Sequence, residues 1–287
     1  MSIAKIRCAA HPFAALYPIV LLGLILLLAP ERAAAQMADD LRVNVEPVPL
    51  GTDDEGNEIT QVGQLTYLGG LHLTSNEPDF GGFSGLYVTP DGRELLAVSD
   101  RGHWWLGRIY EQDGLLFDVG SHLLTPVLGA NQMELSPVQQ DLEALAVDGE
   151  TVFVARERVH EIVRHVFTLP GDLLSVTYSV PRAYPKLAGW RNMPPNGGLE
   201  AMVALGHDLL FVLSEESVNL DGTGQGWLLY DGLYQTLSLK RAQNFKPTDM
   251  ALLPDGDILV LLRRYNPFTG VAVRLCVIDR QMLKPEA

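Results

Sequence analysis

Polar side chains recur at one point of a short phrase that the sequence repeats four times, and their types are suited to binding a metal ion. The first position of the phrase holds, in chain order, Ser84, Glu143, Glu200 and Thr248, with Asp249 directly after the last of these. Carboxylates and hydroxyls are the oxygen ligands that a hard cation such as calcium accepts. We therefore predict a Ca2+ site at Glu143, Glu200 and Asp249, with the Ser84 hydroxyl contacting the substrate.

Charged residues recur a second time, 13 to 16 residues later, where each copy ends an apolar segment: Asp100, Arg101, Arg156, Glu157, Glu215, Glu216, Arg263 and Arg264. One interpretation is that strands entering solvent simply end on polar residues. The other is a functional ring, in which arginine guanidinium groups offer paired donors to phosphate or carboxylate. The second interpretation predicts a small anionic or ester substrate that is held partly through a metal ion.

Specific roles follow from this second interpretation. We predict catalytic roles for Asp100, Arg101, Glu143, Glu200 and Glu215. We predict substrate contacts for Ser84, His103, Arg156 and Arg263. His103 precedes two tryptophans that could wall a pocket, although packing in the core is an equal alternative for them. The segment around Ser84 lacks the last glycine of a G-x-S-x-G elbow, which argues against a serine nucleophile.

The repeat also predicts the elements that position these side chains. Each copy consists of a short apolar strand, a tight turn and a second apolar strand, and the copies start 59, 57 and 48 residues apart. Asp-Gly turns between apolar runs are a strong hairpin signal. Further strand-like pieces lie between the copies, at 164–169 with 176–180 and at 226–230 with 234–239. Two hairpins per unit predict an all-β propeller of four-stranded antiparallel blades, with a β-sandwich as the alternative.

The first 35 residues have the layout of a cleavable secretory signal. Basic residues precede an apolar stretch from Leu16 to Ala29, and small residues follow it. The stretch is shorter than the ~20 residues that a membrane anchor needs. We expect an exported protein, periplasmic or secreted, with a signal at 1–35, a partly irregular segment at 36–62 and the propeller domain at 63–287.

Charge and cysteine content narrow the possible partners. The formal net charge is −14, which disfavours nucleic acid and anionic membrane surfaces as partners. Past the expected signal, Cys276 is the one remaining cysteine, so an intramolecular disulfide cannot form. The oligomeric state stays open.

The repeated phrases resemble those of the phytase-like family of exported bacterial proteins, known as "esterase-like activity of phytase". The matching phrases are FSGLYVTPDGRELLAVSDRG, DLEALAV, GGLEAMVAL, LLFVLSEES and KPTDMALLPDGDILVLLRR. The resemblance implies a six-bladed propeller that hydrolyses phosphate or carboxylic esters with calcium. It carries over to Ser84, Asp100, Arg101, Glu143, Glu200, Glu215 and Asp249. Four repeats are too few for six blades, so we expect either a shortened C-terminus or a ring with fewer blades.

Three functions are compatible with these observations. The first is a metal-assisted hydrolase of phosphate or other esters with its site in the propeller mouth. The second is a non-catalytic binding or scaffold propeller, because propellers also serve recognition alone. The third is a calcium-dependent lactonase, since six-bladed lactonases resemble this chain in placing a glutamate at the start of an inner strand.

Overall fold

The fold is described from a computed structural model, in which residues 41–230, 232–241 and 244–283 are described. The chain divides into a unit at 1–37 and a compact unit at 38–287, and all described residues belong to the second. The predicted signal at 1–35 therefore lies outside the described residues. Among the residues described, no helix is both long and apolar enough to cross a bilayer.

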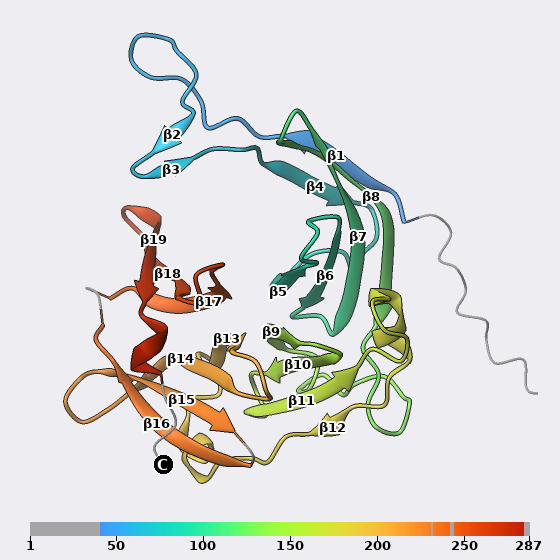
Figure 1. Ribbon diagram of the computed structural model, residues 1–287, viewed down its shortest axis with the longest axis vertical. Helices are drawn as coiled ribbons and strands as arrows, with labels where there is room; N and C mark the ends of the chain where they lie inside the picture. Colours follow the sequence, from blue (N-terminus) through green and yellow to red (C-terminus); the bar gives the residue numbers. More distant parts are fainter. Residues whose placement is uncertain (1–40, 231, 242–243, 284–287) are drawn as a thin grey trace, which may run out of the picture. The chain divides into compact units, whose positions relative to one another are not determined.

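Four antiparallel sheets form the body of this unit, as the repeat predicts (Figure 1). Blade 1 contains β5 (Phe83–Val88), β6 (Glu94–Ser99), β7 (His103–Gln112) and β8 (Leu115–Pro126). Blade 2 contains β9 (Leu142–Asp148), β10 (Thr151–Arg156), β11 (Glu161–Val166) and β12 (Arg182–Ala183). Blade 3 contains β13 (Leu199–Ala204), β14 (Leu210–Val218), β15 (Gly224–Tyr230) and β16 (Leu233–Leu239). Blade 4 contains β17 (Lys246–Leu252), β18 (Ile258–Asn266) and β19 (Gly270–Ile278).

The first strand of each blade lies innermost and the last lies outermost, so the fold is an all-β propeller arrangement (Figure 1). Strands β5, β9, β13 and β17 follow one another as neighbours around the inside. Tight turns join the first two strands, and Gly92, Gly149 and Gly256 in these turns have φ values of 74°, 56° and 93°. Glycine adopts such values without the steric cost that a Cβ atom brings.

Apolar side chains between successive blades hold the sheets together. Leu96 and Trp104 of blade 1 pack against Leu145 and Val154 of blade 2. Blade 3 packs in the same way on blade 2 on one side and on blade 4 on the other. The second strand of blades 1, 2 and 3 is covered on both faces, which explains its nearly unbroken apolar sequence.

The two end blades differ in how their outer faces are covered. A two-stranded sheet of β1 (Val43–Pro47) and β4 (Leu71–Ser75) lies on blade 1, where Leu71 and Leu73 pack beside Trp105. A small hairpin of β2 (Gln61–Val62) and β3 (Leu65–Thr66) precedes β4. The corresponding face of blade 4 stays open, and Val273 and Val277 on β19 are 56% and 58% exposed.

Two expectations about the strands need correction. Residues 176–180 form no strand, because 173–178 is a 3-10 helix, η1 (Leu173–Tyr178), whose first turn is capped by the Asp172 side chain. The outer strand of blade 2 is the two-residue β12 instead. The two remaining short helices are η2 (Ala188–Asn192) and η3 (Arg280–Met282). The described residues form four blades and the β1–β4 sheet, not the six blades that the resemblance implies.

Candidate functional site

Each innermost strand carries a β-bulge at the same point of the repeat. The pairing of the first two strands skips one residue in every blade, and the skipped residues are Ser84, Glu143, Glu200 and Thr248. A bulge residue does not take part in the regular backbone pairing of the two strands. Its side chain therefore does not follow the alternation between the two faces of the sheet. The four positions that the sequence aligns are therefore structurally equivalent.

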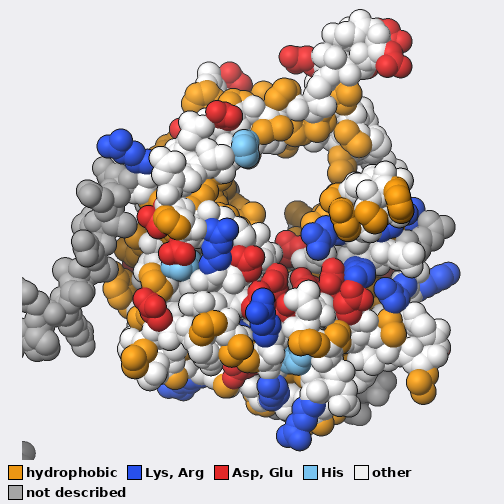
Figure 2. Space-filling view, turned by 180° about the vertical axis from the view of Figure 1, so that it is seen from behind, with side chains coloured by type: hydrophobic (Ala, Val, Ile, Leu, Met, Phe, Trp, Pro, Cys, Tyr) orange, Lys and Arg blue, Asp and Glu red, His pale blue; other side chains and the backbone are white. Residues whose placement is uncertain are grey.

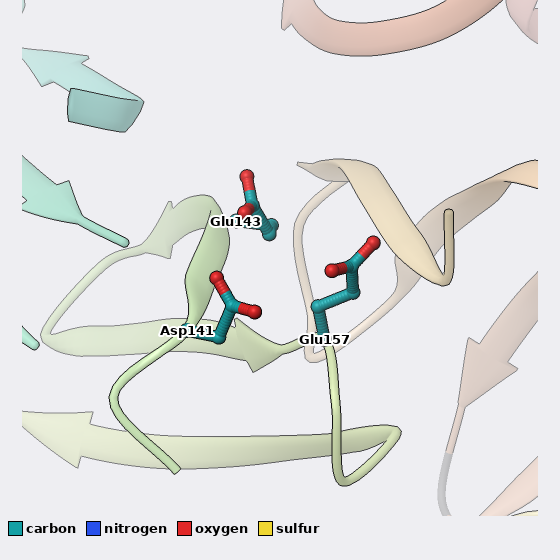
Figure 3. Close-up of side chains that lie close together, drawn as sticks. All are labelled: Asp141, Glu143 and Glu157. Carbon is teal, nitrogen blue, oxygen red and sulfur yellow. The ribbon is translucent and has the colours of Figure 1, made fainter. Parts of the chain in front are cut away.

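Four carboxyl groups lie together at this level, and we call Asp141, Glu143, Glu157 and Glu200 the carboxylate cluster. One oxygen each of Asp141, Glu143 and Glu157 lies within 4.8 Å of the others (Figure 3). Asp141 and Glu143 also form a side-chain hydrogen bond, and Glu200 forms one with Glu157. Each of these two pairs places two acidic side chains in direct contact.

The backbone positions the cluster by joining blade 2 to blade 3. The Glu157 N–H donates to the Asp141 carbonyl at 2.9 Å. The Glu157 carboxylate accepts hydrogen bonds from the N–H groups of Gly197 and Gly198, the second at 3.1 Å. A Cβ atom on Gly198 would lie 2.9 Å from Nδ1 of His160, so this close approach requires glycine. Glu157 is only 2% exposed and has a fixed orientation.

Burial dominates the electrostatics of the cluster. It raises the pKa of Glu143 to about 8, helped by the charges of Glu157 and Asp141 and opposed by a hydrogen bond with Ser84. It raises the pKa of Glu200 to about 10, together with the hydrogen bond to Glu157 and the charge of Glu143. Burial penalises the charged form of a carboxyl group, and a nearby carboxylate adds to that penalty. A bound cation would favour the ionised forms instead.

Charged residues follow the cluster around the rim. In each blade the residue before the bulge pairs with a residue on the second strand, namely Ser99, Arg156, Ser214 or Leu262. The residues that come directly after these four are therefore structurally equivalent: Asp100, Glu157, Glu215 and Arg263. Arg263 lies 3.8 Å from Glu215, and Lys246 pairs with Glu216. Figure 2 shows acidic and basic side chains gathered near the centre of one face. Arg158, 54% exposed, pairs with Asp141 and places a positive charge directly beside the cluster.

Some predicted site residues lie outside the cluster. Arg156 is 4% exposed and pairs with Glu161 at 3.5 Å within blade 2, so it does not face the mouth. Asp249 accepts a hydrogen bond from the Met250 N–H, and burial raises its pKa to about 6. Of the predicted metal ligands Glu143, Glu200 and Asp249, Glu143 alone belongs to the described group of carboxylates whose oxygens lie within 4.8 Å of one another. Arg101 and His103 lie in a separate cleft beside Asp100.

Sequence reasoning assigned no catalytic, substrate or metal role to three residues of the site. Asp141 is not part of the repeated phrase, because Gly82, Gly198 and Lys246 take its place in the other blades. Glu157 was among the recurring charged residues, but the substrate contact was assigned to its neighbour Arg156. Arg158 follows directly and gives no signal of its own.

The sequence profile of the phytase-like family, described as "Esterase-like activity of phytase", matches residues 78–287. The chain belongs to this family. The match covers all four blades of this phytase-like protein, including every member of the carboxylate cluster. No curated protein matches the sequence significantly.

Solved structures similar to this phytase-like protein share little sequence with it. Virginiamycin B lyase from Staphylococcus aureus is 9% identical with a TM-score of 0.39, over 81% of this chain and 88% of that one. A putative 6-phosphogluconolactonase from Bacteroides fragilis is 13% identical with a TM-score of 0.35, over 69% and 58%. The WD40 repeats of RRP9 are 14% identical with a TM-score of 0.33, over 67% and 50%.

Proposed function

We propose that this phytase-like protein is an exported hydrolase of phosphate or other esters, with its active site at the carboxylate cluster. The observation that supports this proposal is that four buried or half-buried carboxyl groups lie beside one another, two of them on bulged inner strands. Such an arrangement is costly for folding, and perturbed carboxyl groups of this kind gather at functional sites.

The donor set of the cluster fits a divalent cation, and the family resemblance suggests Ca2+. Asp141, Glu143 and Glu157 would hold the ion, since each offers a carboxylate oxygen within the same 4.8 Å. Calcium prefers oxygen ligands of this type. When bound, a divalent cation would polarise the ester and make water easier to deprotonate.

The chain's own residues would orient the substrate and handle the proton. The Ser84 hydroxyl interacts with Glu143 and would help to orient that carboxylate. Glu200 faces the same space from blade 3 and, when ionised, would accept the proton of the attacking water. Arg158 would stabilise negative charge that develops on the ester group, because it lies at the exposed edge of the cluster.

The proposal can be tested by measuring hydrolysis of aryl phosphates, phytate, aryl esters and sugar lactones with Ca2+ and with a chelator. We expect Ca2+-dependent turnover that a Glu143→Gln, Glu200→Gln double variant loses. Glu150→Gln is the matched control, because Glu150 is an exposed glutamate at the far end of the same hairpin. Equal rates in the double variant and the wild type would refute the assignment of the site.

A further inference from the structure

A cleft beside the carboxylate cluster has the size and lining of a ligand site. Its volume is about 480 Å3, and its polar lining consists of Asp79, Asp100, Arg101, His103, Glu134 and Gln140. Small-molecule sites typically measure roughly 300–1,000 Å3. Asp100 connects the cleft with the cluster, because Asp141 and Arg158 both influence the pKa of Asp100, which burial raises.

The polar groups of the cleft are held in place by the backbone. Arg101 donates a hydrogen bond to the carbonyl of Pro78. Nδ1 of His103 lies 3.0 Å from the Arg101 carbonyl, and Nε2 lies 3.7 Å from the Asp79 carboxylate. Gly102, with φ of 77°, lets the Gln140 side chain lie against the chain, since a Cβ there would be 2.8 Å from Cγ of Gln140. The lining is thus pre-organised before any ligand arrives.

The lining of the cleft contains more carboxylates, which accept hydrogen bonds, than positively charged side chains. Asp79, Asp100 and Glu134 are carboxylates, whereas Arg101 is the cleft's one permanent cation among the described residues. Hydroxyl groups donate to carboxylates, and Arg101 and Gln140 can donate to hydroxyl oxygens in return. Buried Val127 and Leu135 form an apolar floor under these groups. An apolar floor with a polar rim suits a ring that has hydroxyl edges and a C–H face.

We infer that this cleft binds the uncharged, polyhydroxylated alcohol part of the substrate, such as a sugar or cyclitol ring. The inference rests on the proposed function and narrows it, because the ester group would lie at the cluster while the polyol lies in the cleft. Hydrolysis adds water across the ester bond, so the acid keeps the oxygen of the water and the polyol leaves with a proton. Three carboxylates repel a ring that carries many phosphates.

The test measures binding rather than turnover, on the Glu143→Gln, Glu200→Gln double variant in the presence of a chelator. Saturation-transfer NMR and calorimetry compare methyl glucoside and myo-inositol with myo-inositol hexakisphosphate. We expect the two neutral rings to bind and the hexakisphosphate to bind at least about tenfold more weakly. Equal or tighter binding of the hexakisphosphate, or no binding of the neutral rings, would overturn the inference.

Two further variants locate the binding. Gln140→Leu and the exposed Glu134→Gln should each weaken binding of the neutral rings by roughly three- to tenfold, because each loses or weakens hydrogen bonds to a hydroxyl. Glu150→Gln should leave binding unchanged. Unchanged binding in both cleft variants would place the ligand elsewhere and refute the site.

The two proposals fail in different ways. Neutral rings that bind in the cleft, with no turnover of any ester by the wild type, would refute the hydrolase and leave the ligand class of the cleft standing. Turnover at the cluster without binding of neutral rings would refute the cleft alone.

Discussion

Replacing Glu200 with glutamine should stabilise the metal-free protein, and the gain should grow with pH. Glu200 has a pKa of about 10 in the folded chain and an ordinary value of 4.5. Below pH 4.5 both the folded and the unfolded state carry the proton. As the pH rises above 4.5, the unfolded chain ionises while the folded chain keeps its proton, so the free energy of unfolding decreases until the pH passes the folded pKa.

The size of the effect follows from the proton linkage. Each pH unit in this window reduces the free energy of unfolding by about 1.4 kcal/mol for one group. At pH 7 the accumulated cost of Glu200 is therefore about 3 kcal/mol, and at pH 5 it is below about 1 kcal/mol. Glutamine stays neutral at every pH, and its amide N–H can still donate to Glu157. We expect Glu200→Gln to raise the melting temperature at pH 7 by roughly 6–12 °C.

Thermal unfolding of the wild type and Glu200→Gln in chelator, from pH 5 to pH 8, measures this difference. Addition of Ca2+ should then stabilise both proteins, because both keep the proposed ligands Asp141, Glu143 and Glu157 and a ligand that binds only the folded state adds to its stability. Glu150→Gln serves as the control, because its side chain is exposed and remote from the cluster. A variant with the same pH dependence as the wild type, or one less stable at pH 8, would refute the electrostatic reasoning.

Three more predictions concern the cluster and the blades. Arg158→Gln should tighten Ca2+ binding several-fold in calorimetry, because it removes the positive charge beside Asp141; weaker binding would mean that Arg158 is needed to orient Asp141. Gly198→Ala should reduce the free energy of unfolding in urea by about 1–3 kcal/mol, because its Cβ would lie too close to His160. Gly189→Ala is the control and should leave that free energy almost unchanged, since a Cβ on Gly189 meets no atom within 4 Å. Leu275→Lys on β19 should cost less than about 1 kcal/mol, whereas Ile162→Lys at the equivalent, covered position of β11 should cost more than about 3 kcal/mol; similar losses would show that the blade 4 face is covered in solution.

The repeated phrase made the inner half of each blade predictable, because its two apolar strands recur in every copy and three of the four turns between them contain Asp-Gly. The outer half was less predictable, since a two-residue strand such as β12 needs little apolar pattern. Asp172 caps a helix where the apolar residues after it indicated a strand. The composition of that segment fits either structure, and only the packing of η1 beside β11 and β7 decides between them.

The candidate site was predictable at the bulges and less so in the loops. Ser84, Glu143 and Glu200 were found because the repeat preserves their position. Arg156 was selected together with its neighbour Glu157, but strand alternation turns Arg156 into the interior beside Glu161. The place of Asp141 in the site depends on a contact between the loop before β9 and Glu157 at the end of β10. The pattern of residues along the sequence does not contain this contact.

The bulge explains why Asp249 does not join the carboxylate cluster. The residue after each bulge is small in the first three blades, Gly85, Ala144 and Ala201, because the neighbouring inner strand packs against it. A Cβ on Gly85 would lie only 2.7 Å from the Leu145 backbone nitrogen. Asp249 occupies this packing position, and Thr248 occupies the bulge, where its hydroxyl donates to the Leu261 carbonyl at 3.4 Å. The position that carries carboxylates in blades 2 and 3 therefore carries a hydroxyl in blades 1 and 4, and any metal chemistry is concentrated between blades 2 and 3.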